Sequence, residues 1–384
     1  MDKLFFTDEH IMIRDMVREF ADTEITPVAR DLDEQGEFPT ALVNKMGELG
    51  LMGILIPEEY GGSGLDMVAF ATAIIELARA DASVAITMAA HTSLGSLPIL
   101  MFGSDEQKNT YLPKLATGEM LGAFGLTEPD AGSDAGATKT KAVRDGDEYV
   151  VNGGKIFITN AGKAGVLSFT SQVIENGKNL GIAAFSISTN TPGLEIGPKE
   201  KKMGWRASDT RQLFFKDMRI QATSILGTPA NGFKTFLKTL TSGRVSIGAL
   251  SIGTALGAYE RALAYSTERI AFGKPINNFQ SVGFKLADMA TKIEASKLLV
   301  FHAAWMKDQG LDITKEAAMA KLFASETAME VTTEAIQIHG GYGYVKEYDV
   351  ERFFRDAKIL EIGEGTSEIQ RLIISREILK EIQI

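Results

Sequence analysis

The hydrophobic pattern of this 384-residue chain changes twice along its length. From residue 7 to about residue 120, apolar residues recur at the three- and four-residue spacing of amphipathic helices. Between about 121 and 228 the pattern changes to short β-branched and aromatic runs, separated by turns such as Asp-Gly-Asp. From about residue 230, long helical patterns return, over 244–270, 278–309, 315–338 and 366–382.

This order predicts an α+β protein with segregated domains, because nothing alternates in the βαβ manner of a doubly wound sheet. We expect a helical N-terminal domain over 1–120, a β domain over 121–229 and a C-terminal helical bundle over 230–384. Local signals place three helix starts: Thr7 as a cap, Pro39 as an opener, and Ser104 with Gln107 as a capping box. The predicted strand runs are LGAFGLT, EYVVNG, KIFITNA, GVLSFTS, GIAAFSIS and RQLFFKDMRI.

Composition excludes several functional classes. A net charge of −10 argues against broad binding to nucleic acids or anionic membranes, which requires a positive field. The chain has no cysteine, and its four histidines show no paired-ligand spacing, so we expect neither thiolate chemistry nor a metal site. The first twenty residues lack the apolar core of a signal peptide, and no stretch reaches about 18 uninterrupted apolar residues, so a cytoplasmic location is expected without membrane insertion.

Two glycine-containing stretches are candidates for ligand binding. Residues 125–137, GLTEPDAGSDAGA, follow a predicted strand, and their small side chains let backbone N–H groups approach a phosphate closely. On glycine content alone, an ordinary tight loop is the favoured interpretation, because the pattern is neither G-x-G-x-x-G after a strand nor a Walker loop. In residues 337–358, QIHGGYGYVKEYDVERFFRDAK, a helix is expected to stop at Gly340 and Gly341 before another helix begins.

Single residues stand out in two further stretches. Glu364 lies between Gly363 and Gly365, just before a plausible helix cap at Thr366, and could reach into a cleft from this turn. A solvated loop carboxylate is the commoner fate of a lone glutamate. In RIAFGK, Arg269 and Phe272 follow a helix containing Gly248, Gly253 and Gly257, whose presence we attribute to close helix packing. The Arg269 guanidinium and the Phe272 ring could contact a nucleotide there, although Arg269 by itself would be interpreted as a surface charge.

Together, these strings resemble the acyl-CoA dehydrogenase family over essentially the whole chain and in the same order. GLTEPDAGSDAGA and QIHGGYGYVKEYDVERFFRD are similar to its two signature patterns, and EGTSEIQR is similar to its catalytic loop. The resemblance implies a middle β barrel or sandwich and a C-terminal four-helix bundle. It also implies FAD bound between these two domains and across a subunit interface, in a homotetramer built as a dimer of dimers.

The resemblance also implies roles for individual residues. Positions lining the flavin, with Thr159 facing N5, would be Phe124, Leu126, Thr127, Gly132, Ser133, Phe157 and Thr159. Positions gripping the FAD of a neighbouring subunit would be Arg269, Phe272, Gln280, Gln337 and Gly341. Thr366 and Glu368 would lie beside the dinucleotide of their own subunit. The acyl-CoA would contact Ser133, Thr241, Arg244 and Gly365.

In this family the chemistry is the conversion of an acyl-CoA to the trans-2-enoyl-CoA. Glu364 would remove the α-proton, and the β-hydride would pass to flavin N5, because no side chain accepts a hydride. A pKa raised toward neutrality by a water-poor cleft would suit this base. The family's other base position corresponds to Gly243, which favours Glu364. An electron-transferring flavoprotein is the expected electron acceptor.

Some positions depart from the family pattern. Phe157 stands where tryptophan is common, Thr241 where aspartate is common, and Glu368 where an amide or small residue is common. The segment AAHTSLGSLPI resembles short-chain, butyryl-type members, and Ala85 replaces the arginine of members acting on glutaryl-CoA, which disfavours a dicarboxylate. Alternatives are a medium- or branched-chain dehydrogenase, a flavin-dependent oxidase or monooxygenase of the same fold, and a non-catalytic acyl-CoA-binding scaffold.

Overall fold

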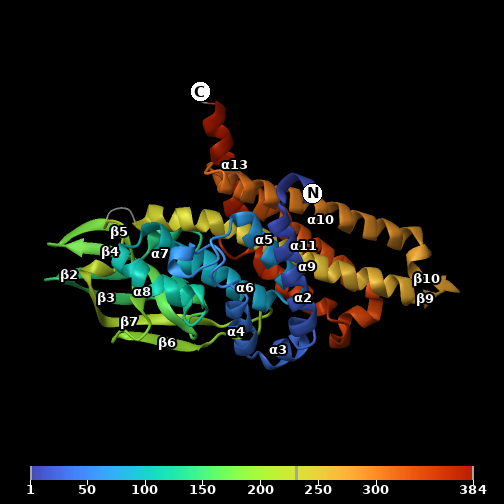
Figure 1. Ribbon diagram of the computed structural model, residues 1–384, viewed down its shortest axis with the longest axis horizontal. Coiled ribbons are helices and arrows are strands. Elements are labelled where there is room, and N and C mark those ends of the chain that lie inside the picture. Colours follow the sequence, from blue (N-terminus) through green and yellow to red (C-terminus); the bar gives the residue numbers. More distant parts are fainter. Residues whose placement is uncertain (1, 230–231, 383–384) are drawn as a thin grey trace.

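The computed structural model describes residues 2–229 and 232–382. The molecule is elongated, with the β strands at one end and the tips of long helices at the other (Figure 1). The remaining helices lie between these two ends. Along the chain, helices come first, then strands, then helices again, so the predicted order of helical, β and helical domains is confirmed. The boundary expected at residue 230 lies outside the described residues.

Helices of the N-terminal domain begin at the predicted caps. The Thr7 hydroxyl accepts a hydrogen bond from the backbone N–H of His10 at the start of α2 (Asp8–Phe20), and the His10 ring accepts one from the Thr7 N–H. Ser104 and Gln107 form the predicted capping box of α8 (Asp105–Ala116). Helix α4 (Thr40–Glu48) starts directly after Pro39. The other helical elements are α1 (Asp2–Phe5), the π turn η1 (Ala21–Ile25), α3 (Ala29–Gln35), η2 (Glu58–Tyr60), α5 (Met67–Ala80), α6 (Ala82–Ala90), the π turn η3 (His91–Ser96) and α7 (Leu97–Phe102).

The π turn η3 connects α6 to α7 and joins the helical domain to the β domain. His91 is completely buried, and its Nδ1 accepts a hydrogen bond of 3.1 Å from the backbone N–H of Gly122. Its Nε2 lies 3.0 Å from the Leu115 carbonyl, and burial lowers the pKa of His91 to about 4, so the ring is neutral. The stretch Ala82–Phe102 is long and apolar enough to span a membrane by length and composition alone, but 83% of its most apolar window is buried in the protein, as in a core helix.

The middle domain contains one mixed sheet of eight strands, in the order β6-β7-β3-β2-β4-β5-β8, with β1 also paired to β4. The two predicted runs EYVVNG and KIFITNA form a single strand, β3, because bulges absorb the glycines between them. Strands β2, β6 and β8 are not among the predicted runs: three of the five residues of β2 are charged, β6 contains a glycine and a proline, and β8 has only two residues. The strands are β1 (Leu121–Gly125), β2 (Lys141–Asp145), β3 (Glu148–Thr159), β4 (Ala164–Glu175), β5 (Lys178–Ser188), β6 (Leu194–Lys199), β7 (Thr210–Gln221) and β8 (Ile225–Leu226).

Three long helices form the body of the C-terminal domain, and α13 packs against α11. Helix α9 begins earlier than the predicted residue 244, because tertiary contacts extend it: Gly232 lies against the backbone of β5, and Phe236 stacks on Phe124 with ring centroids 4.1 Å apart. The elements are α9 (Gly232–Glu268), the hairpin β9 (Ile270–Ala271) and β10 (Lys274–Pro275), η6 (Ile276–Asn278), α10 (Gln280–Asp308), α11 (Thr314–His339), η7 (Gly340–Tyr344), η8 (Lys346–Tyr348), α12 (Val350–Ala357), η9 (Lys358–Glu361) and α13 (Ser367–Ile382).

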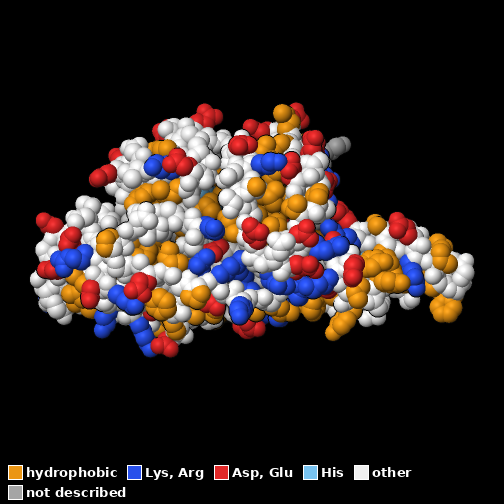
Figure 2. All heavy atoms as spheres, turned by 90° about the horizontal axis from the view of Figure 1, so that it is seen from below, with side chains coloured by type: hydrophobic (Ala, Val, Ile, Leu, Met, Phe, Trp, Pro, Cys, Tyr) orange, Lys and Arg blue, Asp and Glu red, His pale blue; other side chains and the backbone are white. Residues whose placement is uncertain are grey.

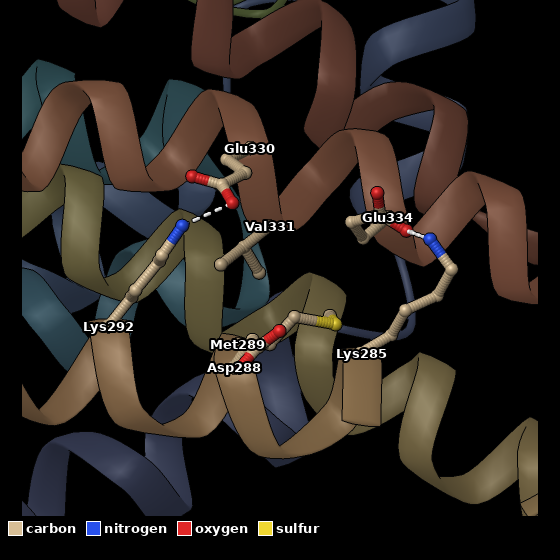
Figure 3. Close-up of a pocket in the computed structure, with 7 residues that line it drawn as sticks. All are labelled: Lys285, Asp288, Met289, Lys292, Glu330, Val331 and Glu334. Atoms are coloured by element: carbon tan, nitrogen blue, oxygen red, sulfur yellow. Dashed lines mark hydrogen bonds and ion pairs between the residues drawn. The ribbon is translucent and has the colours of Figure 1, made fainter. Parts of the chain in front are cut away.

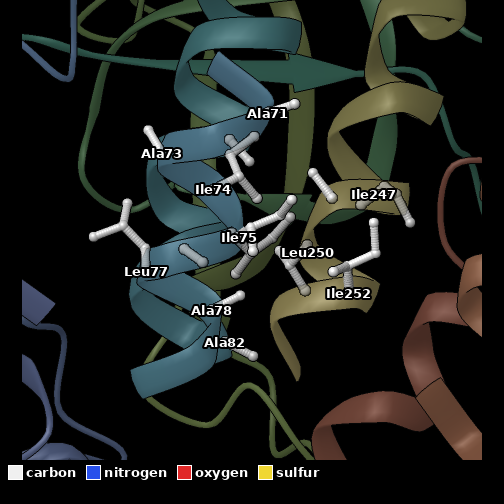
Figure 4. Close-up of a cluster of buried hydrophobic side chains, with 14 of the residues drawn as sticks. Ala71, Ala73, Ile74, Ile75, Leu77, Ala78, Ala82, Ile247, Leu250 and Ile252 are labelled. Atoms are coloured by element: carbon white, nitrogen blue, oxygen red, sulfur yellow. The ribbon is translucent and has the colours of Figure 1, made fainter. Parts of the chain in front are cut away.

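The largest hydrophobic core lies where α5 and α6 pack against α9 (Figure 4). Ile75 and Ala78 of α5 face Leu250 of α9 there, and each large apolar side chain stabilises the fold by about 1.5–3 kcal/mol when buried. A Cβ atom built on Gly253 would lie 2.4 Å from the Ile75 carbonyl oxygen. Close helix packing therefore accounts for this glycine, as predicted from the sequence.

Buried charges lock α12 against the other two domains. Arg352 Nη1 lies 2.6 Å from a carboxylate oxygen of Asp81, the residue that caps α6. Asp356 accepts a hydrogen bond of 2.6 Å from the backbone N–H of Trp205, between β6 and β7. Arg355 pairs with Asp33 of α3 at 2.6 Å. These contacts fix how the three domains sit around the segment that follows α12.

Candidate active site

Glu364 lies in the turn between η9 and α13 and has an unusual backbone conformation. Its φ of +52° is in the left-handed region, and Gly365 follows with a φ of +94°. Two donors hold the Gly365 carbonyl: Lys321 Nζ of α11 at 2.8 Å and Gln370 Nε2 of α13 at 2.8 Å. Because a non-glycine residue in this region costs on the order of 1 kcal/mol, these contacts support the turn.

The Glu364 side chain points at helix α9. A Cβ atom built on Gly243 would lie 2.0 Å from Glu364 Oε2 and 3.3 Å from Cδ2 of Leu94 in η3. Within the described parts of the chain, Oε2 is buried and has no hydrogen-bond partner. The Nε atom of the neighbouring Arg244 is also buried without a partner, while its Nη1 donates to the Thr241 hydroxyl over 3.4 Å. A carboxylate and a guanidinium, each with unused bonding capacity, are therefore close enough for each charge to affect the other.

Burial sets the ionisation of these groups. Loss of hydration raises the pKa of Glu364 to about 7, against the opposing charges of Lys321 and Arg244. Burial likewise lowers the pKa of Lys321 to about 8 and lowers the pKa of Arg244. Glu364 is therefore poised to exchange a proton near neutral pH, as a general base requires.

The end of β1 and the middle of β3 form the second part of the site. The backbone N–H of Ile156 donates to the Thr127 carbonyl at 2.9 Å, and Lys155 Nζ donates to the Leu126 carbonyl at 3.1 Å. A bulge between Lys155 and Ile158 turns Phe157 outward, with a φ of +62° and an exposed fraction of 62%. The structure thus brings together the predicted positions Leu126, Thr127 and Phe157, with Thr159 at the end of the same strand.

Other predicted positions lie nearby. Phe124 stacks on Phe236 of α9. Gly132 and Ser133 lie in the exposed loop after β1, and a Cβ atom on Gly132 would meet no atom of the described residues within 4 Å. In the same loop, a Cβ atom on Gly136 would lie 4.0 Å from Cζ of Phe233, which places the loop beside the start of α9.

A buried ion pair supports this loop and was not predicted from the sequence. Lys155 Nζ lies 2.7 Å from a carboxylate oxygen of Glu128, and both side chains are buried. Glu128 also accepts hydrogen bonds from the backbone N–H groups of Lys139 and Thr140. Both residues stand within strings already singled out, GLTEP and KIFITN, but only the fold shows that they pair. Lys321 was also missed, and its signal is a lysine within the alanine-rich helical stretch AAMAKLFASETA.

The positions predicted to grip a neighbour's FAD are at the opposite end of α9. Arg269 precedes the β9–β10 hairpin and lies 5.4 Å from the Tyr342 ring of η7. Phe272, at the hairpin tip, is 95% exposed with a φ of +50°. Gln280, Gln337 and Gly341 are exposed at the adjoining ends of α10, α11 and η7. The 37 residues of α9 span about 55 Å, so these positions and the β1–β3 region are too far apart for one dinucleotide to touch both within one chain (Figure 1).

Thr366 and Glu368 begin α13. The Thr366 hydroxyl accepts a hydrogen bond of 3.3 Å from the backbone N–H of Ile369, which is the predicted helix cap. Glu368 is exposed, and hydrogen bonds from its own backbone N–H and from Thr366 lower its pKa. Both residues follow directly on the turn that carries Glu364.

A surface pocket between α10 and α11 is separate from this site (Figure 3). Its charged walls are ion pairs, Lys285 with Glu334 and Lys292 with Glu330. None of the predicted site residues lines it. Across residues 2–229 and 232–382, no group of three or more His, Asp or Glu side chains is placed to hold a metal ion.

Comparison with known proteins identifies a family for each of the three domains. Family models described as the N-terminal, middle and C-terminal domains of acyl-CoA dehydrogenase match residues 7–119, 123–218 and 230–379. A probable acyl-CoA dehydrogenase of Bacillus subtilis (strain 168) is 54% identical over 376 residues, 97% of this chain and 99% of the relative.

Two solved structures are similar over most of the chain. Butyryl-CoA dehydrogenase from Megasphaera elsdenii has a TM-score of 0.94 at 42% identity and covers 97% of this chain and 98% of its own. An acyl-CoA dehydrogenase from Bacillus anthracis, complexed with FAD, has a TM-score of 0.93 at 37% identity and covers 98% of this chain and 68% of its own. The predicted family is confirmed, and this chain belongs to the acyl-CoA dehydrogenases.

Proposed function

We propose that this enzyme desaturates a short-chain acyl-CoA to the trans-2-enoyl-CoA, with Glu364 as the base that removes the α-proton. The observation that carries the proposal is Oε2 of Glu364, which lies against Gly243 and is buried without a hydrogen-bond partner among the described residues; the carboxyl has a pKa of about 7 and is acted on by the charge of Arg244. A loop glutamate held in water would have neither property.

The protein's residues bind and orient the thioester. We expect the backbone N–H of Glu364 to donate to the thioester oxygen, where negative charge develops as the proton leaves, and such a donor contributes on the order of 3 kcal/mol. Thr241, Arg244, Gly365 and Ser133 are the proposed contacts of the acyl-CoA. Lys321 and Arg244 stabilise the ionised form of Glu364 before the proton is taken.

The cofactor is FAD, and the residues at the β1–β3 region fit it. Phe157 is an aromatic side chain turned outward on a bulge, and aromatic rings stack favourably on other planar rings. Open space beside Gly132 allows a ligand to approach the backbone. We assign the flavin to Phe124, Leu126, Thr127, Gly132, Ser133, Phe157 and Thr159, and the dinucleotide beside it to Thr366 and Glu368. When bound, FAD accepts the hydride that no side chain can take up.

The separation of the two predicted FAD regions supports an oligomer. Arg269, Phe272, Gln280, Gln337 and Gly341 would complete the FAD site of a second copy, because they lie at the far end of α9. The hairpin end also displays exposed Ile270, Phe272 and Phe284, and hydrophobic side chains are visible at this end of the molecule in Figure 2. We propose a dimer of dimers on this basis.

A short acyl chain is supported by the segment that forms η3. A Cβ atom built on Gly243 would lie 3.3 Å from Leu94 Cδ2 and 2.0 Å from Glu364 Oε2, so Leu94 lies on the same side of α9 as the base and limits the space there. Ala85 in α6 is completely buried and adds no cation that would pair with a second carboxylate. The similar solved structure from Megasphaera elsdenii is named a butyryl-CoA dehydrogenase. We further propose an electron-transferring flavoprotein as the electron acceptor and a cytoplasmic location. The proposed domain limits are 1–120, 121–229 and 230–384.

Anaerobic addition of butyryl-CoA to the purified holoenzyme tests the assignment. We expect the flavin absorbance to bleach, and Glu364→Gln to bind FAD and ligand but to bleach about 10²–10⁴ times more slowly, since a neutral amide cannot accept the proton. Glu330→Gln, on the outer surface of α11, is the control and should behave as the unmodified enzyme. Bleaching by Glu364→Gln at the normal rate would contradict the assignment.

The same assay separates the alternatives. Octanoyl-CoA and isobutyryl-CoA should bleach the flavin more slowly than butyryl-CoA, and a reversed order would indicate a medium- or branched-chain enzyme. After bleaching, air should restore the absorbance slowly, because a dehydrogenase passes electrons to a protein acceptor. Rapid oxygen consumption during turnover would instead indicate an oxidase.

A further inference from the structure

Lys321 is a completely buried lysine in α11, which is rare unless the charge has a partner. Its ammonium group donates a hydrogen bond of 2.8 Å to a backbone carbonyl, that of Gly365. Burial lowers the pKa of Lys321 to about 8, so the ammonium form still predominates at neutral pH. A cation is therefore retained next to the turn that carries the base.

The turn needs external support. Glu364 and Gly365 are consecutive residues in the left-handed region, and Glu364 has a side chain that disfavours it. The Gly365 carbonyl accepts from Lys321 on one side and from Gln370 on the other. Gln370 belongs to the helix that follows the turn, whereas Lys321 belongs to α11, so Lys321 anchors the turn to the helical bundle.

Among the described residues, the charges that act most strongly on Glu364 and Lys321 come from α9, α11 and the segment before α13. Glu364 faces Lys321 from α11 and Arg244 from α9. Lys321 faces Glu364 and Glu361 from the segment before α13, Arg244 from α9, and Glu326 one turn further along α11. Both cations favour the carboxylate form of Glu364, while desolvation opposes it.

We propose that Lys321 is a positioning residue for Glu364: it holds the Gly365 carbonyl so that the turn aims the carboxylate at Gly243, and its charge favours the ionised form of Glu364. This inference rests on the proposed role of Glu364 as the base. Lys321 acts through the turn and the field, without contact to substrate.

Three variants separate its two effects. Lys321→Met removes the charge and the hydrogen bond, Lys321→Gln removes the charge and leaves an amide donor, and Gln370→Leu removes the other, neutral donor. Loss of the cation should raise the pKa of Glu364. The acid limb of the kcat/KM profile should then move about one pH unit or more to higher pH in both Lys321 variants. Gln370→Leu should lower kcat without moving the limb.

A second measurement is independent of turnover. The carboxyl band of Glu364 can be followed by infrared difference titration, as the band that is lost in Glu364→Gln. Its midpoint should move to higher pH in Lys321→Met and Lys321→Gln and stay in place in Gln370→Leu. If one Lys321 variant fails to fold, the other still gives this midpoint.

The results of these experiments distinguish a failure of the Lys321 inference from a failure of the proposed function. Unchanged midpoints in the folded Lys321 variants, or an equal shift in Gln370→Leu, would overturn the inference. If the unmodified holoenzyme does not bleach with any acyl-CoA, or if Glu364→Gln bleaches normally, the proposed function fails instead. The infrared titration would then still decide whether Lys321 controls the Glu364 carboxyl.

Discussion

The Glu364 carboxylate occupies space that only a glycine leaves free on α9. A β-carbon on Gly243 would lie 2.0 Å from Oε2, far inside van der Waals contact. The contacted atom is the far end of a flexible side chain, so the helix can accept a larger residue if the carboxylate moves away. A methyl group added at this position would therefore displace the Glu364 carboxylate, while the fold would be little affected.

Gly243→Ala should accordingly lower kcat on the order of a hundredfold, as displacement of a reacting group by about 1 Å does. Its melting temperature should stay the same or rise, because alanine favours a helix by about 1 kcal/mol over glycine. Gly283→Ala in α10 is the matched control, since its added methyl group would lie 3.7 Å from the nearest atom outside its own helix. Wild-type turnover by Gly243→Ala would show that the carboxylate does not rest against α9.

Between elements, the Lys155–Glu128 pair ties the middle of β3 to the loop after β1. Lys155 is completely buried and donates to Glu128, to the Leu126 carbonyl and to the Thr170 hydroxyl. The buried ammonium group of Lys155 thus anchors the proposed flavin loop to β3. Removing one partner leaves the other charge buried and unpaired, which is far more costly than losing a surface pair.

Lys155→Met should lower the free energy of unfolding by about 3–5 kcal/mol, measured by urea denaturation. Adding Glu128→Gln should recover most of the loss, because the amide oxygen still accepts from the backbone N–H groups while no charge stays buried. The surface pair Lys216–Glu195 serves as the comparison, and Lys216→Met should cost less than about 1 kcal/mol. A double variant as unstable as Lys155→Met alone would argue against charge burial as the cause.

At the scale of the whole molecule, α9 separates two sets of cofactor-binding positions. The flavin-side positions lie with the β domain at one end, and Arg269 lies near the hairpin at the other (Figure 1). Lys and Arg side chains also gather across the middle of the underside, although the net charge is −10 (Figure 2). If each FAD is shared by two copies, then two differently inactivated chains should complement each other.

Co-expression of Glu364→Gln with Arg269→Ala tests this arrangement. A mixed dimer contains one site with an intact Glu364 and an intact Arg269 from the neighbour, so roughly a quarter of the wild-type activity is expected from random pairing. Each variant expressed alone should be nearly inactive. For Arg269→Ala, the expected cause is loss of FAD. A mixture no more active than its components would mean that each site is complete within one chain.

Much of the fold follows from local pattern. The caps at Thr7 and Ser104 were predictable because a hydroxyl and a backbone N–H three residues apart meet in the first helical turn. The β domain was predictable because β-branched and aromatic runs are confined to one segment. The early start of α9 was not, because it depends on contacts of Gly232 and Phe236 with strands far away in sequence.

The candidate site divides in the same way. The glycines on either side of Glu364 and the glycine at position 243 can be read directly from the sequence. The motifs that contain them indicated the family. Only the tertiary structure decided that Oε2 is buried without a partner among the described residues, that Lys321 supports the turn and that Lys155 pairs with Glu128. The reason is physical: helix caps and periodicity depend on neighbours along the chain, whereas desolvation and charge pairing depend on which distant segments exclude water from the same point.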